Sequence, residues 1–141
     1  MLYSKRQPQI GDIYTMRFEG SGNEQQGKRP GLVFQNNTGN KFSPNIIALP
    51  LTSVIKRSDL PTHVVVPAEE TGLYKDSMVL CENPTCISKD KIGEYITTLP
   101  KSLMHKVAAA NLLASSAISF LNPEELISVW TKAIGLNNCL S

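Results

Sequence analysis

The residues best suited to chemistry lie in one polar stretch, residues 22–30, which reads Gly-Asn-Glu-Gln-Gln-Gly-Lys-Arg-Pro and joins two apolar runs. A guanidinium can bind two phosphate oxygens at once through its planar fork, whereas a lysine offers a mobile point charge. We therefore expect Arg29 to bind a phosphate; the alternative is a solvated hairpin loop whose arginine has no role. The other polar side chains of the stretch include Glu24, Gln25, Gln26 and Lys28.

The elements around this stretch are mostly short strands. Alternating apolar and polar residues, or short β-branched runs, predict strands over residues 12–18, 31–35, 45–52, 62–66, 77–82 and 94–99. Their spacing and the long polar connections favour a mainly β fold, a small antiparallel barrel with C-terminal helices, over a parallel sheet with crossover helices. Pro50 favours an edge strand or a bulge in the third strand, because proline has no N–H for a sheet hydrogen bond.

The C-terminal part of the chain has a helical pattern. Apolar residues at spacings of three and four predict a helix over residues 102–121. The sequence Asn122-Pro123-Glu124-Glu125 has the N-cap, the first-position proline and the third-position glutamate of a second helix, which we expect to end at Gly135. This helix is expected to pack on the barrel, because its large apolar side chains would otherwise be exposed. These side chains are Leu126, Ile127, Trp130 and Ile134.

Length and composition indicate one domain. A chain of 141 residues can bury one core, and a formal net charge of +2 means that nucleic-acid binding would depend on local clusters of cations. No apolar run is long enough to span a bilayer and no leader is recognised, so a cytoplasmic protein is expected. Cys81, Cys86 and Cys139 lack the spacing of a metal or redox motif and are expected to be reduced. His63 and His105 do not complete a zinc site, so no metal or other cofactor is expected.

Several separate stretches, in the same order, resemble the MazF/PemK family of bacterial toxins. They are the loop motif, the threonine that ends the third strand, the segments 39–44 (Gly-Asn-Lys-Phe-Ser-Pro) and 60–63 (Leu-Pro-Thr-His), and Asp76-Ser77 with the strand that follows. The resemblance covers about residues 10–121. It implies a compact Src-homology-3-like barrel with a C-terminal helix in residues 1–121, and it leaves residues 122–141 as a helical extension of the same domain.

The resemblance also implies a function. Members of the family are toxins of toxin–antitoxin systems that cleave single-stranded RNA (mRNA) at specific sequences without a metal ion, and a cognate MazE-like antitoxin holds them inactive. The resemblance implies a homodimer as well, which an apolar barrel edge at Pro50 would favour. The alternative is a non-catalytic toxin of the same fold that inhibits a protein target such as a topoisomerase.

By the same resemblance, the catalytic residues are Glu24, Arg29 and Thr52. The RNA 2′-hydroxyl would attack the adjacent phosphorus and leave 2′,3′-cyclic phosphate and 5′-hydroxyl ends. Arg29 would stabilise charge on the phosphorus, and Thr52 would direct its hydroxyl at a phosphate oxygen. Glu24 would act as the general base or orient Arg29. The simpler alternatives are a local backbone hydrogen bond for Thr52 and a surface ion pair for Glu24.

Further residues are expected to contact the RNA beside the cut. For His63 the alternative is a structural or interface role, and for Lys56 and Arg57 it is a solvated loop. The family often has a basic residue just before Cys86, where this chain has Thr85, and this difference bears on the rate or the target sequence. The expected RNA-binding residues are Gln25, Gln26, Lys28, Ser53, Lys56, Arg57 and His63.

Overall fold

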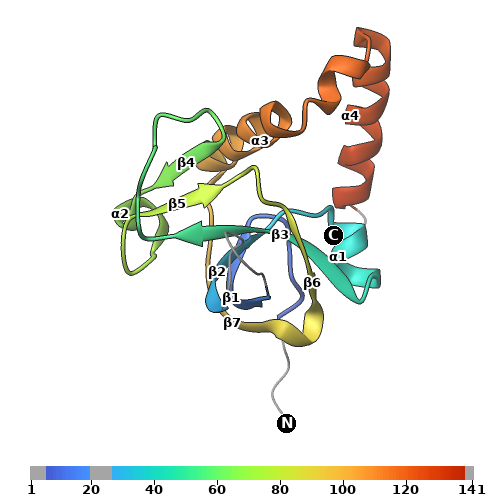
Figure 1. Ribbon diagram of the computed structural model, residues 1–141. Helices are drawn as coiled ribbons and strands as arrows, with labels where there is room; N and C mark the ends of the chain where they lie inside the picture. Colours follow the sequence, from blue (N-terminus) through green and yellow to red (C-terminus); the bar gives the residue numbers. More distant parts are fainter. Residues whose placement is uncertain (1–5, 20–26, 139–141) are drawn as a thin grey trace.

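The structure is a computed structural model that describes residues 6–19 and 27–138. In these residues seven strands form one sheet in the order β4-β5-β3-β2-β1-β7, with β6 also pairing with β3 (Figure 1). Every pair is antiparallel, so the predicted mainly β, antiparallel class is confirmed. The strands are β1 (Asp12–Phe18), β2 (Gly27–Val33), β3 (Asn45–Thr52), β4 (His63–Val66), β5 (Ser77–Leu80), β6 (Thr85–Ser88) and β7 (Ile92–Thr98).

The helices lie between and after the strands. The α-helices are α1 (Asn37–Phe42), α2 (Ala68–Thr71), α3 (Lys101–Ser115) and α4 (Pro123–Asn138), and the 3-10 helices are η1 (Lys89–Lys91) and η2 (Ala117–Phe120). The single helix predicted over residues 102–121 is wrong in its last part. Ser116 has a left-handed φ of 56°, which ends α3, and the chain continues as η2. Of the predicted apolar stripe, only Leu103, Val107 and Ala110 are buried.

Pro50 does not lie on an edge strand, so the edge-strand alternative of the prediction is wrong. β3 is central in the sheet, and Pro50 pairs with Gly31 of β2. On the other side of β3, residues 45–48 pair with β6 and residues 51–52 pair with β5. Pro50 therefore lies where β3 changes partner, so its missing N–H costs no sheet hydrogen bond. Because Pro50 is not at an edge, it gives no support to the predicted homodimer.

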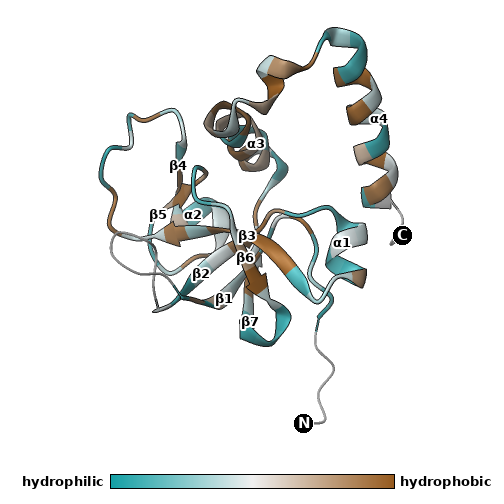
Figure 2. Ribbon diagram, turned by 45° about the vertical axis from the view of Figure 1, so that its right-hand side comes forward, coloured by the Kyte–Doolittle hydropathy of each residue, from teal (hydrophilic) through white to brown (hydrophobic). Residues whose placement is uncertain are grey.

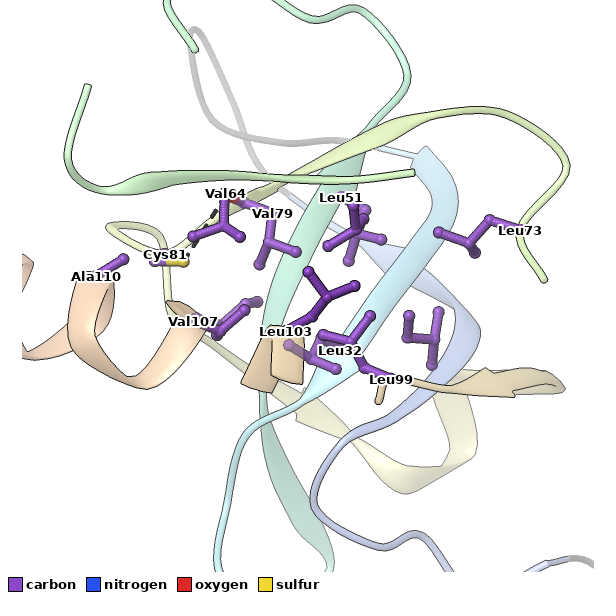
Figure 3. Packing of buried hydrophobic residues seen from close by; sticks show 13 residues of the cluster. Leu32, Leu51, Val64, Leu73, Val79, Cys81, Leu99, Leu103, Val107 and Ala110 are labelled. Carbon is purple, nitrogen blue, oxygen red and sulfur yellow. Dashed lines mark hydrogen bonds between the residues drawn. The ribbon is translucent and has the colours of Figure 1, made fainter. Parts of the chain in front are cut away.

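The main apolar cluster joins α3 to the sheet. Leu103, Val107 and Ala110 of α3 pack against side chains from the strands, and Figure 3 shows the two groups meeting. Burial of each large apolar side chain contributes roughly 1.5–3 kcal/mol, so this cluster holds β2 and β3 in fixed relative positions. The other buried members are Ile13, Leu32, Leu49, Leu51, Val64, Val66, Leu73, Val79, Cys81 and Leu99.

A buried carboxylate anchors the start of β1. Asp12 is fully buried and accepts hydrogen bonds from Nε and Nη2 of Arg6, both at 3.1 Å, and from the backbone N of Gln9 at 3.0 Å. The hydroxyls of Thr98 (2.9 Å) and Tyr14 (3.3 Å) also donate to it. Burial, together with the charge of Asp12, raises the pKa of Tyr14 to about 12. The network fixes β1, the strand on which β2 pairs.

Two cysteines fall within the described residues, and both are free thiols, as predicted. Cys81 belongs to the main apolar cluster, and burial, with a smaller effect of Glu82, raises the pKa of its thiol to about 12. Cys86 is exposed on β6. Cys139 lies outside the described residues.

α4 begins as predicted but does not pack on the barrel as predicted. The Asn122 side chain accepts from the Glu125 backbone N at 2.9 Å, and the Glu125 carboxylate accepts from the Asn122 N at 3.0 Å, which is a capping box. The chain has left the barrel before α4 begins, and α4 runs back so that only its C-terminal end meets α1 (Figures 1 and 2). Ile127 and Trp130 are each 66 % exposed, so the predicted docking through the apolar stripe is wrong.

Two hydrogen bonds join α4 to α1. The Thr38 hydroxyl donates to the Leu136 carbonyl at 2.7 Å, and the Asn137 side chain accepts from the Asn37 backbone N at 2.9 Å. Apolar residues recur along α4 and are visible as brown bands in Figure 2. The helix therefore stands beside the barrel rather than on it.

Candidate active site

A pocket of about 400 Å³ opens where β2, the end of β3, the turn before β5 and β7 come together. Arg29 and Thr52 both line it, so the structure brings together the two predicted catalytic residues that it describes. Among the described lining residues there are two cations, Arg29 and Lys75, and no carboxylate, which favours an anionic ligand. The remaining lining residues are Pro30, Leu51, Ser53, Val54, Leu73, Tyr74, Ser77 and Ile96.

Close packing of β2 on β1 positions Arg29. Arg29 is half-buried and lies opposite Met16 in the strand register. Two residues further on, a Cβ on Gly31 would come within 2.6 Å of the Met16 sulfur and 3.0 Å of the Phe18 ring. A side chain at residue 31 would therefore have to displace the buried side chains of Met16 and Phe18, which glycine leaves undisturbed. A guanidinium held on a strand of the barrel keeps its direction better than one on a solvated loop.

A local hydrogen bond orients the Thr52 hydroxyl. Thr52 ends β3, and its Oγ1 accepts a hydrogen bond from the backbone N of Val54 at 3.1 Å. The predicted local backbone bond is therefore present. It uses a lone pair and leaves the hydroxyl hydrogen available to donate to a ligand in the pocket, because a hydroxyl is one donor and two acceptors. The local bond and the proposed phosphate contact are therefore compatible.

His63 holds the loop that follows Thr52 and does not line the pocket. Its Nδ1 lies 2.8 Å from the Arg57 carbonyl oxygen, and its Nε2 lies 2.9 Å from Oε2 of Glu82. The carbonyl oxygen can only accept, so Nδ1 carries a hydrogen. His63 thereby ties the loop before β4 to the end of β5. Of the two roles expected for His63, the contacts match the structural one.

The residues of the loop after β3 that were predicted to bind RNA differ in whether they line the pocket. Ser53 lines it, whereas Lys56 and Arg57 do not. The guanidinium of Arg57 forms a two-pronged ion pair with Asp59, at 3.1 and 3.3 Å, and this hydrogen bonding lowers the pKa of Asp59. Both partners are exposed, so the pair is screened by solvent.

Lys28 lies beside the pocket-lining part of β2. It is exposed and stands opposite Arg17 of β1, which is exposed too. Like charges directly opposite each other destabilise a strand pair, so an anion bound between them would relieve the repulsion. The sequence analysis did not identify Arg17 as a second cation at this position, because its pairing with Lys28 depends on the strand register, which the sequence alone does not give. Glu24, Gln25 and Gln26 lie outside the described residues.

Tyr74 and Lys75 line the pocket and were not predicted either. They lie in the turn between α2 and β5, and the sequence around them carries no motif. Tyr74 is 99 % exposed. The buried Leu73 and the half-buried Ile96 complete an apolar wall of the pocket.

The described parts of the chain show neither a metal-binding cluster nor a membrane-spanning helix. No group of three or more His, Cys, Asp or Glu residues there is arranged to hold a metal ion. No described helix is both long and apolar enough to cross a membrane.

Comparison with known proteins gives a consistent result. Residues 9–113 match the family described as the PemK-like, MazF-like toxin of type II toxin–antitoxin systems. The chain is 39 % identical over 111 residues to endoribonuclease EndoA of Bacillus subtilis, and the match covers 78 % of this chain and 96 % of that protein. The match to the family ends within α3, so η2 and α4 lie beyond it.

Solved structures share the fold. A crystal structure of MazF from Deinococcus radiodurans matches with a TM-score of 0.70 at 23 % identity, over 79 % of this chain and 99 % of that chain. A mycobacterial endoribonuclease in complex with its cognate antitoxin matches with a TM-score of 0.64 at 24 % identity, over 82 % of this chain and 99 % of that chain. The predicted MazF-type barrel is thereby confirmed as the fold.

Proposed function

Because the chain belongs to the PemK-like, MazF-like toxin family of type II toxin–antitoxin systems, we propose that it is an endoribonuclease toxin that cuts single-stranded RNA at specific sequences without a metal ion. The observation that carries this proposal is the meeting of Arg29 and Thr52 in one pocket without a described carboxylate. Such a pocket suits a phosphodiester, whose oxygens need donors and positive charge.

The proposed reaction uses the nucleophile of the substrate. The RNA 2′-hydroxyl loses its proton and attacks the adjacent phosphorus, the bond from phosphorus to the 5′-oxygen of the next nucleotide breaks, and that oxygen gains a proton. The products are a 2′,3′-cyclic phosphate and a 5′-hydroxyl end. The protein has to help in both proton transfers and stabilise the charge on the pentacoordinate phosphorus.

Each proposed catalytic residue has one role in this reaction. Arg29 binds two oxygens of the phosphate and stabilises their charge in the transition state, because its guanidinium stays protonated and is a poor proton donor. Thr52 donates the hydrogen that its bond with Val54 leaves available. Glu24 is the proposed base that takes the 2′-hydroxyl proton, or the group that orients Arg29, and this role rests on the family resemblance alone.

Residues around the pocket are proposed to bind the RNA on either side of the cut. Ser53 lies nearest, since it lines the pocket itself, and Lys28 brings a cation on the adjoining part of β2. Lys56 and Arg57 lie on the loop that His63 ties down, so His63 acts on RNA binding through that loop. Gln25 and Gln26 are proposed as further contacts on the strength of the resemblance.

The proposal extends to partners. The related endoribonuclease that was solved with its cognate antitoxin supports a MazE-like antitoxin as the inhibitor of this chain. A homodimer is proposed from the family resemblance. Because its substrate is cellular RNA and its two described cysteines are free thiols, the cytoplasm is the proposed site of action.

The test is to map the ends that the purified protein makes in a mixed RNA pool, with and without excess chelator. We expect cuts at one short sequence, 2′,3′-cyclic phosphate and 5′-hydroxyl ends, and no effect of the chelator. An RNA with hydrogen in place of the one 2′-hydroxyl at the cut should bind but stay intact. Loss of activity in chelator, or cutting of the deoxy-substituted RNA, would contradict the mechanism. An RNA pool that stays uncut would favour the alternative, a non-catalytic toxin of the same fold.

A further inference from the structure

Tyr74 is an aromatic side chain that the fold does not use. It lines the pocket yet is 99 % exposed, the highest value among the large hydrophobic side chains described. An aromatic ring that buries no area contributes almost nothing to the stability of the folded chain. Its position at the pocket therefore calls for another explanation.

The turn that carries Tyr74 is fixed on its N-terminal side. Gly72 ends α2 with a left-handed φ of 86°, and the Thr71 carbonyl accepts from the Thr97 hydroxyl at 2.6 Å. The Thr71 hydroxyl oxygen accepts from the backbone N of Leu73 at 3.2 Å. Leu73 itself is buried in the main apolar cluster. The residue just before Tyr74 is thus held in place.

The turn is fixed on its C-terminal side too. The Asp76 carboxylate accepts from the backbone N of Ala68 at 2.8 Å, and the Ser77 hydroxyl donates to the Lys75 carbonyl at 3.1 Å. Tyr74 is therefore an exposed ring on an ordered turn. Such a ring can bind a ligand with a small loss of conformational entropy, since a tyrosine has only two side-chain torsions.

We propose that Tyr74 is a stacking platform for one base of the RNA beside the cut, and that Lys75 binds a phosphate next to that base. The inference rests on the proposed function of the same pocket and names the residues that hold the substrate there. Leu73 and Ile96 supply the apolar wall against which the edge of the base lies, and Arg29 lies in the same pocket for the phosphate that is cut.

The chemistry of the pocket favours a nucleotide over a peptide. An exposed ring, a cation and a small apolar wall are the elements that single-strand RNA sites combine, because every base has a flat face and every nucleotide a charge. A peptide groove needs several aromatic side chains or an open strand edge. Tyr74 is the only aromatic residue among those described as lining this pocket.

The test compares Tyr74→Ala, Tyr74→Phe and Phe120→Ala. Phe120 is 88 % exposed on η2 and does not line the pocket, so its removal controls for the loss of any exposed ring. The probe is an RNA of the mapped target sequence with a 2′-deoxy sugar at the cut and 2-aminopurine at one position at a time, whose fluorescence falls on stacking.

We expect Tyr74→Ala to weaken binding by about 5- to 100-fold and to abolish the fluorescence loss at one position beside the cut. Tyr74→Phe and Phe120→Ala should bind within about twofold of the wild type. In Lys75→Gln, the slope of log affinity against log salt concentration should become shallower by about one, the amount that corresponds to one phosphate contact.

Unchanged RNA affinity and unchanged fluorescence in Tyr74→Ala, with cleavage intact, would overturn this inference and leave the proposed function standing. A variant that binds RNA normally but loses affinity for an antitoxin peptide would also overturn it, in favour of a protein-binding role. A wild-type protein that neither binds nor cuts the RNA would overturn the proposed function itself.

Discussion

Arg29 and Thr52 line one pocket, although they come from β2 and from the end of β3. The two strands pair from Gly31 to Val33, next to both residues. This pairing places the two side chains on the same pocket. The site is therefore built by the sheet and not by the loop alone.

The Thr52 hydroxyl is predicted to promote cleavage by donating a hydrogen bond to the phosphate. Thr52→Val keeps the shape but removes the acceptor for the Val54 N–H and the donor to the charged phosphate, so the single-turnover cleavage rate should fall by roughly 10- to 100-fold. Thr52→Ser should keep most of the rate. Equal rates for the valine and serine variants would mean that the hydroxyl has no part in the reaction.

α4 is predicted to be dispensable for the barrel. Removal of residues 123–141 breaks the two hydrogen bonds with α1 that are seen among the described residues, each contributing about 1 kcal/mol, and removes exposed apolar surface. We expect a fall of about 2 kcal/mol at most in the free energy of unfolding, measured in urea, and an unchanged cleavage rate. A barrel that no longer folds would show that α4 packs on it closely in solution.

Tyr14 is predicted to make the protein less stable at alkaline pH. Its pKa is raised from 10.0 to about 12 in the folded state, so the unfolded chain loses this proton first. The contribution of the protonated Tyr14 hydroxyl to the free energy of unfolding is fully present below pH 10 and is lost as the pH rises towards 12. At about 1.4 kcal/mol per tenfold change, the loss is at most about 3 kcal/mol.

Tyr14→Phe isolates this effect, because it leaves every other titratable side chain, including the buried Cys81, unchanged. Near pH 8 the variant should be less stable by about 1 kcal/mol, since Asp12 loses one donor. Between pH 10 and 12 its free energy of unfolding, measured in urea, should fall less steeply than that of the wild type. Parallel curves would contradict the raised pKa.

Local patterns predicted much of the fold. β1 and β3 have the predicted bounds, and the capping box of Asn122 and Glu125 starts α4 where the sequence places it. β6 was missed because Ile87 is its only buried residue, which leaves no alternation to recognise. The position of Pro50 was misjudged because the change of partner along β3 depends on two strands that lie far ahead in the chain.

The site was predictable only in part. Arg29 was predicted to bind a phosphate from the polar stretch itself, Thr52 was predicted from the family resemblance, and the pocket contains both. Tyr74 and Lys75 were missed because a turn brings them to the pocket through contacts with Thr97 and Ala68, which no spacing encodes. The docking of α4 was also misjudged, because an apolar stripe indicates a helix face but does not identify its partner.

The catalytic role of Arg29 can be separated from RNA binding by the single-turnover cleavage rate of Arg29→Ala, taken together with the affinity of this variant for the deoxy-substituted RNA. If Arg29 stabilises charge in the transition state, the rate should fall by about 100-fold or more while the affinity falls much less. Arg29→Lys should recover only part of the rate, because an ammonium keeps the charge but loses the two-pronged geometry. An Arg29→Ala protein that cuts RNA at the wild-type rate would show that Arg29 has no catalytic role.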